Sequence, residues 1–352
     1  MRQTWRLGVL AGAVGAACMV GAAPAGAQAV VSNGTISLGV RASGDLNVAD
    51  AAGRPNYGGV GVQYEPTGFD GTYAGCTCEG WGAGISGGDH DGTWGGANSS
   101  VGGVTNLSDI TFSSTATTAT SAVTIRSGAT DVLRVTQLYQ PSPATPNLYQ
   151  VTVTLENLTG ATLGEGAQGI RYRRVMDWDI PFPGHEVVTM RGWGADNLIA
   201  TSSNGFTGSN VFLPLGTICG APANSNFTDI GPCDHGAAFD FAFPALTAGS
   251  SRTFVIFYGA AANLDAARAA LGLVEAEVAS WAFCGEGRTP GGTFGTCEGA
   301  DGTTFVFGFQ GVGGDPVEPP PGVVPEPGTV LLTATGLIGM LVGVRIRRRR
   351  DA

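Results

Sequence analysis

The feature that most constrains the fold of this chain is a series of short segments in which apolar and polar residues alternate. In LYQVTVTLEN, from Leu148, the valines and Leu155 would face one side of a strand, and the threonines and Glu156 the other. Six more segments are rich in Val, Thr, Phe and Tyr, with Gly, Asn, Pro and Ser clusters between them. They begin at Ser121, Asp131, Ile170, Ala237, Arg252 and Thr303. This pattern predicts a mainly β, β-sandwich-like domain with one solvated sheet face.

One amphipathic helix is expected near the C-terminal end of this domain. Asn263 is a suitable N-cap, and apolar residues then recur at spacings of three and four up to Trp281. The apolar stripe consists of Leu264, Ala267, Leu271, Val274, Val278 and Trp281. We expect the helix to cover a face or edge of the sheet, with Gly272 as its weak point.

The first 29 residues have the three regions of a secretory signal peptide. Arg2 and Arg6 precede an apolar stretch, and Ala27 and Ala29 are the small residues of the cleavage site. The sequence therefore predicts export by the Sec machinery, with cleavage after Ala29. Cys18 offers a lipoprotein alternative, but it lacks the branched residue that usually stands three positions upstream.

The end of the chain combines a proline-flanked glutamate, an apolar run and a basic cluster. The run 329–344 would form a helix about 24 Å long, short of the hydrocarbon core of about 30 Å. The arginines that follow place the end of the chain in the cytoplasm. The residues of this motif are Pro325, Glu326, Pro327, Arg345, Arg347, Arg348, Arg349 and Arg350.

This order of parts resembles the PEP-CTERM sorting signal of exported bacterial proteins. The resemblance implies processing by an exosortase, with the body first held in the inner membrane and then carried to the cell surface or released. An ordinary C-terminal membrane anchor is the alternative. FVIFYGAA from Phe254, the helix with Glu277 and Phe283, and FVFGFQGVGG from Phe305 also resemble other PEP-CTERM proteins, which have no assigned activity.

The chain therefore divides into four predicted segments. A signal peptide (1–29) precedes an exported β-rich domain (30–310). A Pro- and Gly-rich linker (311–323), which favours extended backbone, leads to the sorting signal (324–352) with its transmembrane helix 329–344.

The charge of the chain argues against nucleic acid as a partner. All 18 basic residues are arginine, and the formal net charge is −10. The two terminal segments hold many of these arginines, so the exported body is more acidic still. Such a surface repels phosphate backbones and favours solubility.

Six cysteines remain after removal of the signal peptide, and an exported chain predicts that they form disulfides. Proximity favours two pairs that each close a loop of about 15 residues. The remaining two cysteines are separated by one residue and would form a strained ring, so exchange between loops stays open. A zinc site that uses this last pair with His90 is another alternative. The cysteines are Cys76, Cys78, Cys219, Cys233, Cys284 and Cys297, the favoured pairs being 219–233 and 284–297.

The stretch from Tyr64 to Gly96 shows no strand pattern and predicts a long structured loop. Its tryptophans could stack on sugar rings, and its aspartates could hold a sugar hydroxyl or calcium. A disulfide-pinned loop that packs its own tryptophans is the structural alternative, and no other cofactor is expected. The candidate ligand residues are Asp70, Trp81, Asp89, Asp91 and Trp94.

A second cluster raises the possibility of catalysis. Asp177 and Asp179 share one face of a predicted strand. With Glu186 and His185 nearby, two of these carboxylates could act as the acid and the nucleophile or base of glycoside hydrolysis. Ion pairs with neighbouring arginines are the structural alternative. HExxH and Walker motifs do not occur. The stretch GISGG from Gly84 fits the GxSxG pattern of a nucleophile elbow, but such matches arise easily by chance in a glycine-rich chain.

We therefore expect a non-catalytic protein of the cell surface or extracellular matrix. Its setting, a biofilm or exopolysaccharide, comes from the PEP-CTERM resemblance, which also makes exosortase and exopolysaccharide its expected partners. The alternative is a secreted carbohydrate-active enzyme delivered by the same sorting signal.

Overall fold

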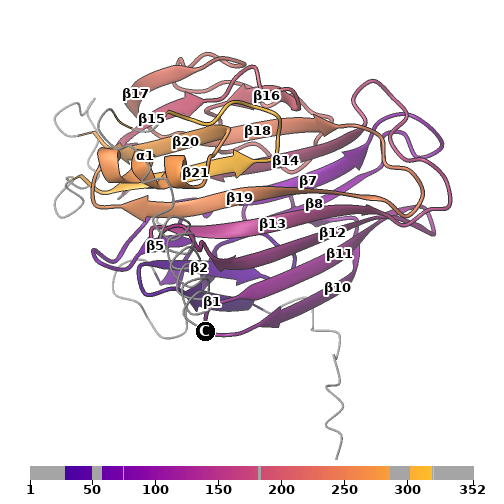
Figure 1. Ribbon diagram of the computed structural model, residues 1–352, viewed down its shortest axis with the longest axis horizontal. Helices are drawn as coiled ribbons and strands as arrows, with labels where there is room; N and C mark the ends of the chain where they lie inside the picture. The colour runs from indigo at the N-terminus through magenta and orange to yellow at the C-terminus, as the bar shows by residue number, and fades with distance from the viewer. Residues whose placement is uncertain are drawn as a thin grey trace, which may run out of the picture.

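The computed structural model describes residues 28–49, 58–73, 75–180, 184–285, 302–318 and 320. Most of the signal peptide, Cys297 and the whole sorting signal with its predicted transmembrane helix lie outside these ranges. In the described part, two antiparallel sheets form the body of the molecule (Figure 1), which confirms the predicted β-sandwich-like fold. None of the helices in these ranges has the length and apolar character needed to cross a bilayer.

The larger sheet has nine strands in the order β10-β11-β12-β13-β19-β21-β20-β15-β17. The strands are β10 (Leu107–Ser114), β11 (Ala119–Ser127), β12 (Thr130–Pro141), β13 (Leu148–Asn157), β15 (Glu186–Arg191), β17 (Phe227–Cys233), β19 (Ser251–Ala261), β20 (Val278–Cys284) and β21 (Thr304–Gln310).

The facing sheet has six strands in the order β16-β18-β14-β7-β8-β9, and smaller sheets of four strands (β1-β2-β5-β6) and two strands (β3-β4) complete the fold. The strands of the six-stranded sheet are β7 (Glu79–Ile85), β8 (Trp94–Asn98), β9 (Gly103–Thr105), β14 (Ile170–Asp177), β16 (Leu198–Ser202) and β18 (Gly236–Phe243). The others are β1 (Gln28–Ser32), β2 (Ile36–Arg41), β3 (Val48–Ala49), β4 (Gly59–Val60), β5 (Val62–Tyr64) and β6 (Phe69–Asp70).

All seven predicted strand segments form strands. In β13, the apolar and polar residues alternate between a buried and a partly exposed face, as predicted. Val151, Val153 and Leu155 are fully buried, whereas the residues between them are partly exposed. Aromatic rings fill the space between the two large sheets. The ring of Phe241 on β18 lies 4.7 Å from that of Phe309 on β21, measured between centroids. This apolar interior explains how the two layers are held together.

The predicted helix is present but shorter than its apolar stripe. Helix α1 (Leu264–Leu273) begins after Asn263, whose side chain accepts a hydrogen bond from Ala266 N, as predicted. It ends because Glu275 has a φ of 50° and the N–H of Ala276 returns to the carbonyl of Leu271. The expectation that Val278 and Trp281 continue the helix is wrong: both belong to β20, where β-branched and aromatic side chains pair with β21.

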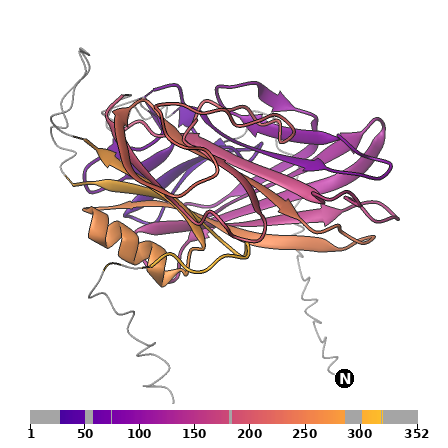
Figure 2. The same ribbon diagram turned by 90° about the horizontal axis from the view of Figure 1, so that it is seen from above.

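Helix α1 covers the outer face of the nine-stranded sheet (Figure 2). Leu271 packs against β21 at Gly308, where an added Cβ would lie 2.9 Å from Leu271 Cδ2. The close approach of helix and sheet therefore depends on a glycine in the strand.

The first residues of the predicted linker lie on the domain. The carboxylate of Glu277 accepts hydrogen bonds from the N–H groups of residues 311–314, at 2.7 to 3.1 Å. Further along, Val317 N donates to the carbonyl of Ala276 at 2.6 Å. The ordered body thus continues past Gln310 to at least Glu318.

The expectation of one long loop between Tyr64 and Gly96 is wrong, because this stretch contains β6, β7 and most of β8. Glycines hide the strand pattern here. An added Cβ at Gly82 would lie 1.9 Å from the carbonyl oxygen of Ser209, in the loop that covers this sheet. The sheet therefore needs glycine where the covering loop touches it, and glycine removes the alternation that reveals a strand.

Candidate functional site

Three aspartates meet where β14 ends and β18 begins. Asp177 is the last residue of β14, Asp179 follows two residues later, and Asp234 lies between β17 and β18. One carboxylate oxygen from each lies within 4.8 Å of the other two. The backbone fixes the first two, because Asp177 N donates to Cys78 O and Asp179 N to Gly71 O, both at 2.8 Å.

Asp177 and Asp179 are buried without the ion pairs expected for them, and Asp234 is partly buried. The side chains of Asp177 and Asp179 are 1% and 0% exposed. Within the described ranges, Asp177 Oδ1, both oxygens of Asp179 and Asp234 Oδ1 have no hydrogen-bond partner. The expectation that neighbouring arginines pair with Asp177 and Asp179 is wrong, because those arginines bind Asp240 and Glu79 instead.

Burial and mutual repulsion shift the acid–base behaviour of the cluster. Burial, with the charges of Asp179 and Asp234, raises the pKa of Asp177 to about 9. Burial and Asp234 raise the pKa of Asp179 to about 7. Burial also raises the pKa of Glu186, although this carboxylate accepts hydrogen bonds from the backbone N–H groups of residues 180 and 184.

The described cysteines gather around these acids. Cys76 and Cys78 form a disulfide, and Cys76 Sγ lies 3.4 Å from Asp177 Oδ2. The predicted disulfide between Cys219 and Cys233 is confirmed, and it immediately precedes Asp234. In the sheet, Glu186 pairs with both Cys233 and Cys284.

Cys284 is also disulfide-bonded, while Cys297, its predicted partner, lies outside the described residues. The zinc alternative for Cys76 and Cys78 is wrong, because sulfurs joined in a disulfide cannot act as thiolate ligands.

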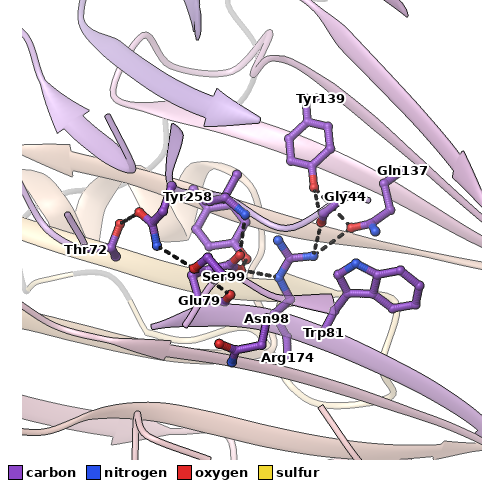
Figure 3. Close-up of polar contacts among 12 residues, drawn as sticks. Gly44, Thr72, Glu79, Trp81, Asn98, Ser99, Gln137, Tyr139, Arg174 and Tyr258 are labelled. Carbon is purple, nitrogen blue, oxygen red and sulfur yellow. Dashed lines mark hydrogen bonds and ion pairs between the residues drawn. The ribbon is translucent and has the colours of Figure 1, made fainter. Parts of the chain in front are cut away.

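A second buried polar group lies between the two sheets (Figure 3). Arg174 Nε donates to Glu79 Oε1 at 2.6 Å, and Arg174 NH1 donates to Gln137 Oε1 at 2.7 Å. The hydroxyl of Tyr258 donates to the same oxygen of Glu79, at 3.0 Å. All of these side chains are buried, so the network ties the six-stranded sheet to the nine-stranded sheet and offers no surface to a ligand.

The predicted ligand-loop residues are distributed over different parts of the fold. Asp70 is fully buried and accepts hydrogen bonds from four backbone N–H groups, at residues 61, 62, 72 and 73. Trp81 is fully buried in the core and donates its indole N–H to Ser43 O. Asp89 and Asp91 are exposed in the turn between β7 and β8, and Trp94 begins β8. Asp70 and Trp81 therefore have structural roles.

A cavity of about 550 Å³ lies between α1, β20 and the segment 315–318. Arg191 and Arg268 both lie over the ring of Trp281, at 5.5 and 6.0 Å from its centroid. Neither guanidinium forms an ion pair with a carboxylate of the described chain. Other lining residues include Thr228, Asp229 and Asp315. A wall with many hydrogen-bond donors and acceptors suits a ligand rich in hydroxyl groups.

Sequence reasoning missed Asp234, Arg191 and Arg268. The only local signal for Asp234 is its place directly after Cys233, in a chain where other cysteines stand close to acids. Arg191 and Arg268 come from β15 and α1, which are far apart in the sequence, so only the packing of the helix on the sheet brings them together.

Comparisons with known proteins do not assign a family. No protein-family model matches the chain, and the curated proteins include no significant relative. Among solved structures, a galactose mutarotase related enzyme from Lactobacillus acidophilus is similar to the chain at 8% identity and a TM-score of 0.32. The alignment covers 83% of this chain and 100% of that one. Similarity at this level carries no argument about activity.

Proposed function

We propose that the chain is an exported, non-catalytic protein of the cell surface or extracellular matrix, sorted by an exosortase and associated with exopolysaccharide. The signal peptide and the PEP-CTERM-like end support export and sorting. Disulfides in the body also support an oxidising destination, because they rarely persist in the cytoplasm.

One observation carries the non-catalytic part of the proposal. The carboxylates that a glycoside hydrolase would need, Asp177, Asp179 and Glu186, have exposed fractions of 1%, 0% and 0%. Hydrolysis requires an acid and a base or nucleophile that flank the scissile bond of a bound sugar. Buried carboxylates cannot approach such a bond, so the described geometry favours binding over turnover.

The cavity over Trp281 is the proposed place for polysaccharide binding. The lining contains the donors Arg191 and Arg268 and the acceptors Thr228 and Asp229. Arg191 NH2 already donates to Thr228 Oγ1 at 2.6 Å, so a sugar would use the remaining N–H groups and lone pairs. Sugar hydroxyl groups can both donate and accept, so a mixed wall of this kind complements them. We expect modest affinity for each sugar. Many sugar repeats along one polymer would then keep the protein bound to it.

Intact mass of the protein from the native host tests sorting. We expect material outside the inner membrane to lack the segment from about Val324 onward and to have lost residues 1–29. We also expect a gain of six hydrogens on reduction. A full-length C-terminus found only in membranes would support an ordinary anchor and contradict exosortase processing.

Binding and turnover of the host's own exopolysaccharide test the rest. We expect the protein to co-sediment with the polymer without releasing reducing ends. Replacement of both Arg191 and Arg268 by Gln should abolish co-sedimentation, whereas Arg134→Gln, at an exposed ion pair on β12, should not change it. Release of reducing ends, lost in Asp177→Asn, would instead establish the carbohydrate-active enzyme.

A further inference from the structure

We propose that Asp177, Asp179 and Asp234 bind one Ca²⁺ ion that holds together the ends of β14, β17 and β18. This inference is independent of the proposed function, because it concerns how the body is stabilised. It also differs from the calcium site that the sequence analysis considered, whose candidate ligands were Asp70, Asp89 and Asp91.

The spacing of the oxygens fits a single cation. Ca²⁺ binds oxygen at about 2.4 Å, so two oxygens on the same ion can be separated by at most about 4.8 Å. One oxygen each from Asp177, Asp179 and Asp234 satisfies this limit for all three pairs. Backbone carbonyls and water would complete the six to eight ligands that Ca²⁺ takes.

The state of Asp179 is the independent observation that points to a ligand. Its side chain is 0% exposed, and neither carboxylate oxygen has a hydrogen bond of good geometry among the described residues; the nearby backbone N–H of Gly75 lowers its pKa only partly. Asp179 Oδ1 lies so close to Gly75 that a Cβ added there would be 2.1 Å away. A buried carboxylate without partners is costly for a fold, and a cation removes that cost.

Contrast with Asp70 strengthens the argument. Asp70 is equally buried, but four backbone N–H groups satisfy its carboxylate. The fold thus provides four backbone donors for one buried aspartate and far fewer for the members of the three-aspartate cluster. Within the described ranges, no arginine forms an ion pair with any of the three, so a cation from solution is the counter-charge that we propose for their ionised form.

The donor set selects Ca²⁺ over other common cations. Three carboxylates provide hard oxygen ligands, whereas zinc sites in proteins favour thiolate and imidazole. Mg²⁺ usually keeps several waters and binds one or two carboxylates. The nearby sulfurs of Cys76 and Cys78 are held in a disulfide and cannot act as thiolates.

The surrounding cross-links give the site a rigid frame. The Cys76–Cys78 disulfide touches Asp177, and the Cys219–Cys233 disulfide ends next to Asp234. Because the three acids come from two separate parts of the chain, an ion would add a link between segments that the disulfides already constrain.

The test uses the full-length protein with its disulfides intact, stripped with EDTA and then titrated with CaCl₂ by calorimetry. We expect one Ca²⁺ per chain and a higher thermal midpoint in Ca²⁺ than in EDTA. Asp179→Asn should weaken Ca²⁺ binding at least about tenfold and remove the thermal shift. Asp89→Asn, in the exposed turn between β7 and β8, is the matched control and should bind as the wild type does.

A comparison of thermal midpoints separates loss of the ion from misfolding. Without Ca²⁺, Asp179→Asn removes repulsion and should be at least as stable as the wild type; with Ca²⁺ it should be less stable. An unchanged midpoint and no heat of binding in the wild type would overturn the proposal. Loss of binding in Asp89→Asn, with Asp179→Asn unaffected, would also overturn it and place the ion in the turn.

Discussion

Arg174 on β14 and Glu79 on β7 form an ion pair in the interior, with an Nε to Oε1 distance of 2.6 Å and side chains that are both 0% exposed. The neighbouring Arg173 points the other way and binds Asp240 of β18. Adjacent residues of one strand thus use opposite faces, one toward the space between the sheets and one toward the loop that covers the six-stranded sheet.

Glu79→Gln should lower the free energy of unfolding by about 3–5 kcal/mol, because it leaves the buried guanidinium of Arg174 without its counter-charge. Urea denaturation measures this change. The control is Glu156→Gln, at an ion pair with Arg134 whose side chains are 41% and 45% exposed, and there the loss should stay below about 1 kcal/mol. Equal losses in the two variants would mean that burial does not strengthen the pair.

Gly82→Ala should destabilise the protein by roughly 1–3 kcal/mol, because its Cβ would collide with the carbonyl oxygen of Ser209. The same substitution at Gly160 adds a Cβ with nothing within 4 Å and should be close to neutral. Thermal or urea unfolding of the two variants provides the comparison. A neutral Gly82→Ala would show that the covering loop does not press on β7.

Removing the Cys219–Cys233 disulfide by a double substitution to Ser should cost about 3 kcal/mol, because the bond closes a loop of sequence separation 14. The same double substitution at Cys76 and Cys78 should cost roughly half as much, because the sequence separation is only 2. Urea denaturation of both variants tests the order. The reverse order would contradict the loop-entropy account.

Glu277→Ala should release the segment 311–314 from the domain, because one carboxylate accepts all four of its backbone N–H groups. Hydrogen–deuterium exchange should become faster in this segment and stay unchanged in β21. Glu275→Ala, at an exposed residue beyond the end of α1, is the control. Unchanged protection in Glu277→Ala would show that other contacts hold the segment.

In EDTA, the protein should lose stability as the pH rises from about 5 to 9. The pKa of Asp177, about 9, and that of Asp179, about 7, exceed the ordinary 3.8, so the folded state binds more protons than the unfolded state across this range. Asp234 and Glu186, whose pKa values are also raised, act in the same direction. Thermal midpoints at the two pH values measure the effect, which Asp177→Asn should reduce. A rise in stability would contradict these shifts.

Much of the fold could be predicted because the strands carry their own pattern. Alternation in β13 and the aromatic content of β18, β19 and β21 identify them without any tertiary information. The Cys219–Cys233 disulfide was also predictable, because proximity along the chain favours short loops. Strands β7 and β8 were missed because they contain many glycines, which remove the alternation of apolar and polar side chains. These glycines make room for a covering loop that lies against the strands only in the folded chain.

The sequence by itself determined the strand-rich body, the N-cap of α1 and the residues of the terminal signals, because local periodicity and short motifs encode them. Only the tertiary structure decided where α1 ends, which carboxylates meet and which of them lack partners. Asp177 and Asp179 looked like partners for arginines of their own strand, yet those arginines bind acids on other strands. Pairing between side chains far apart in the sequence depends on strand order and burial. Neither of these can be predicted from the local pattern of residues.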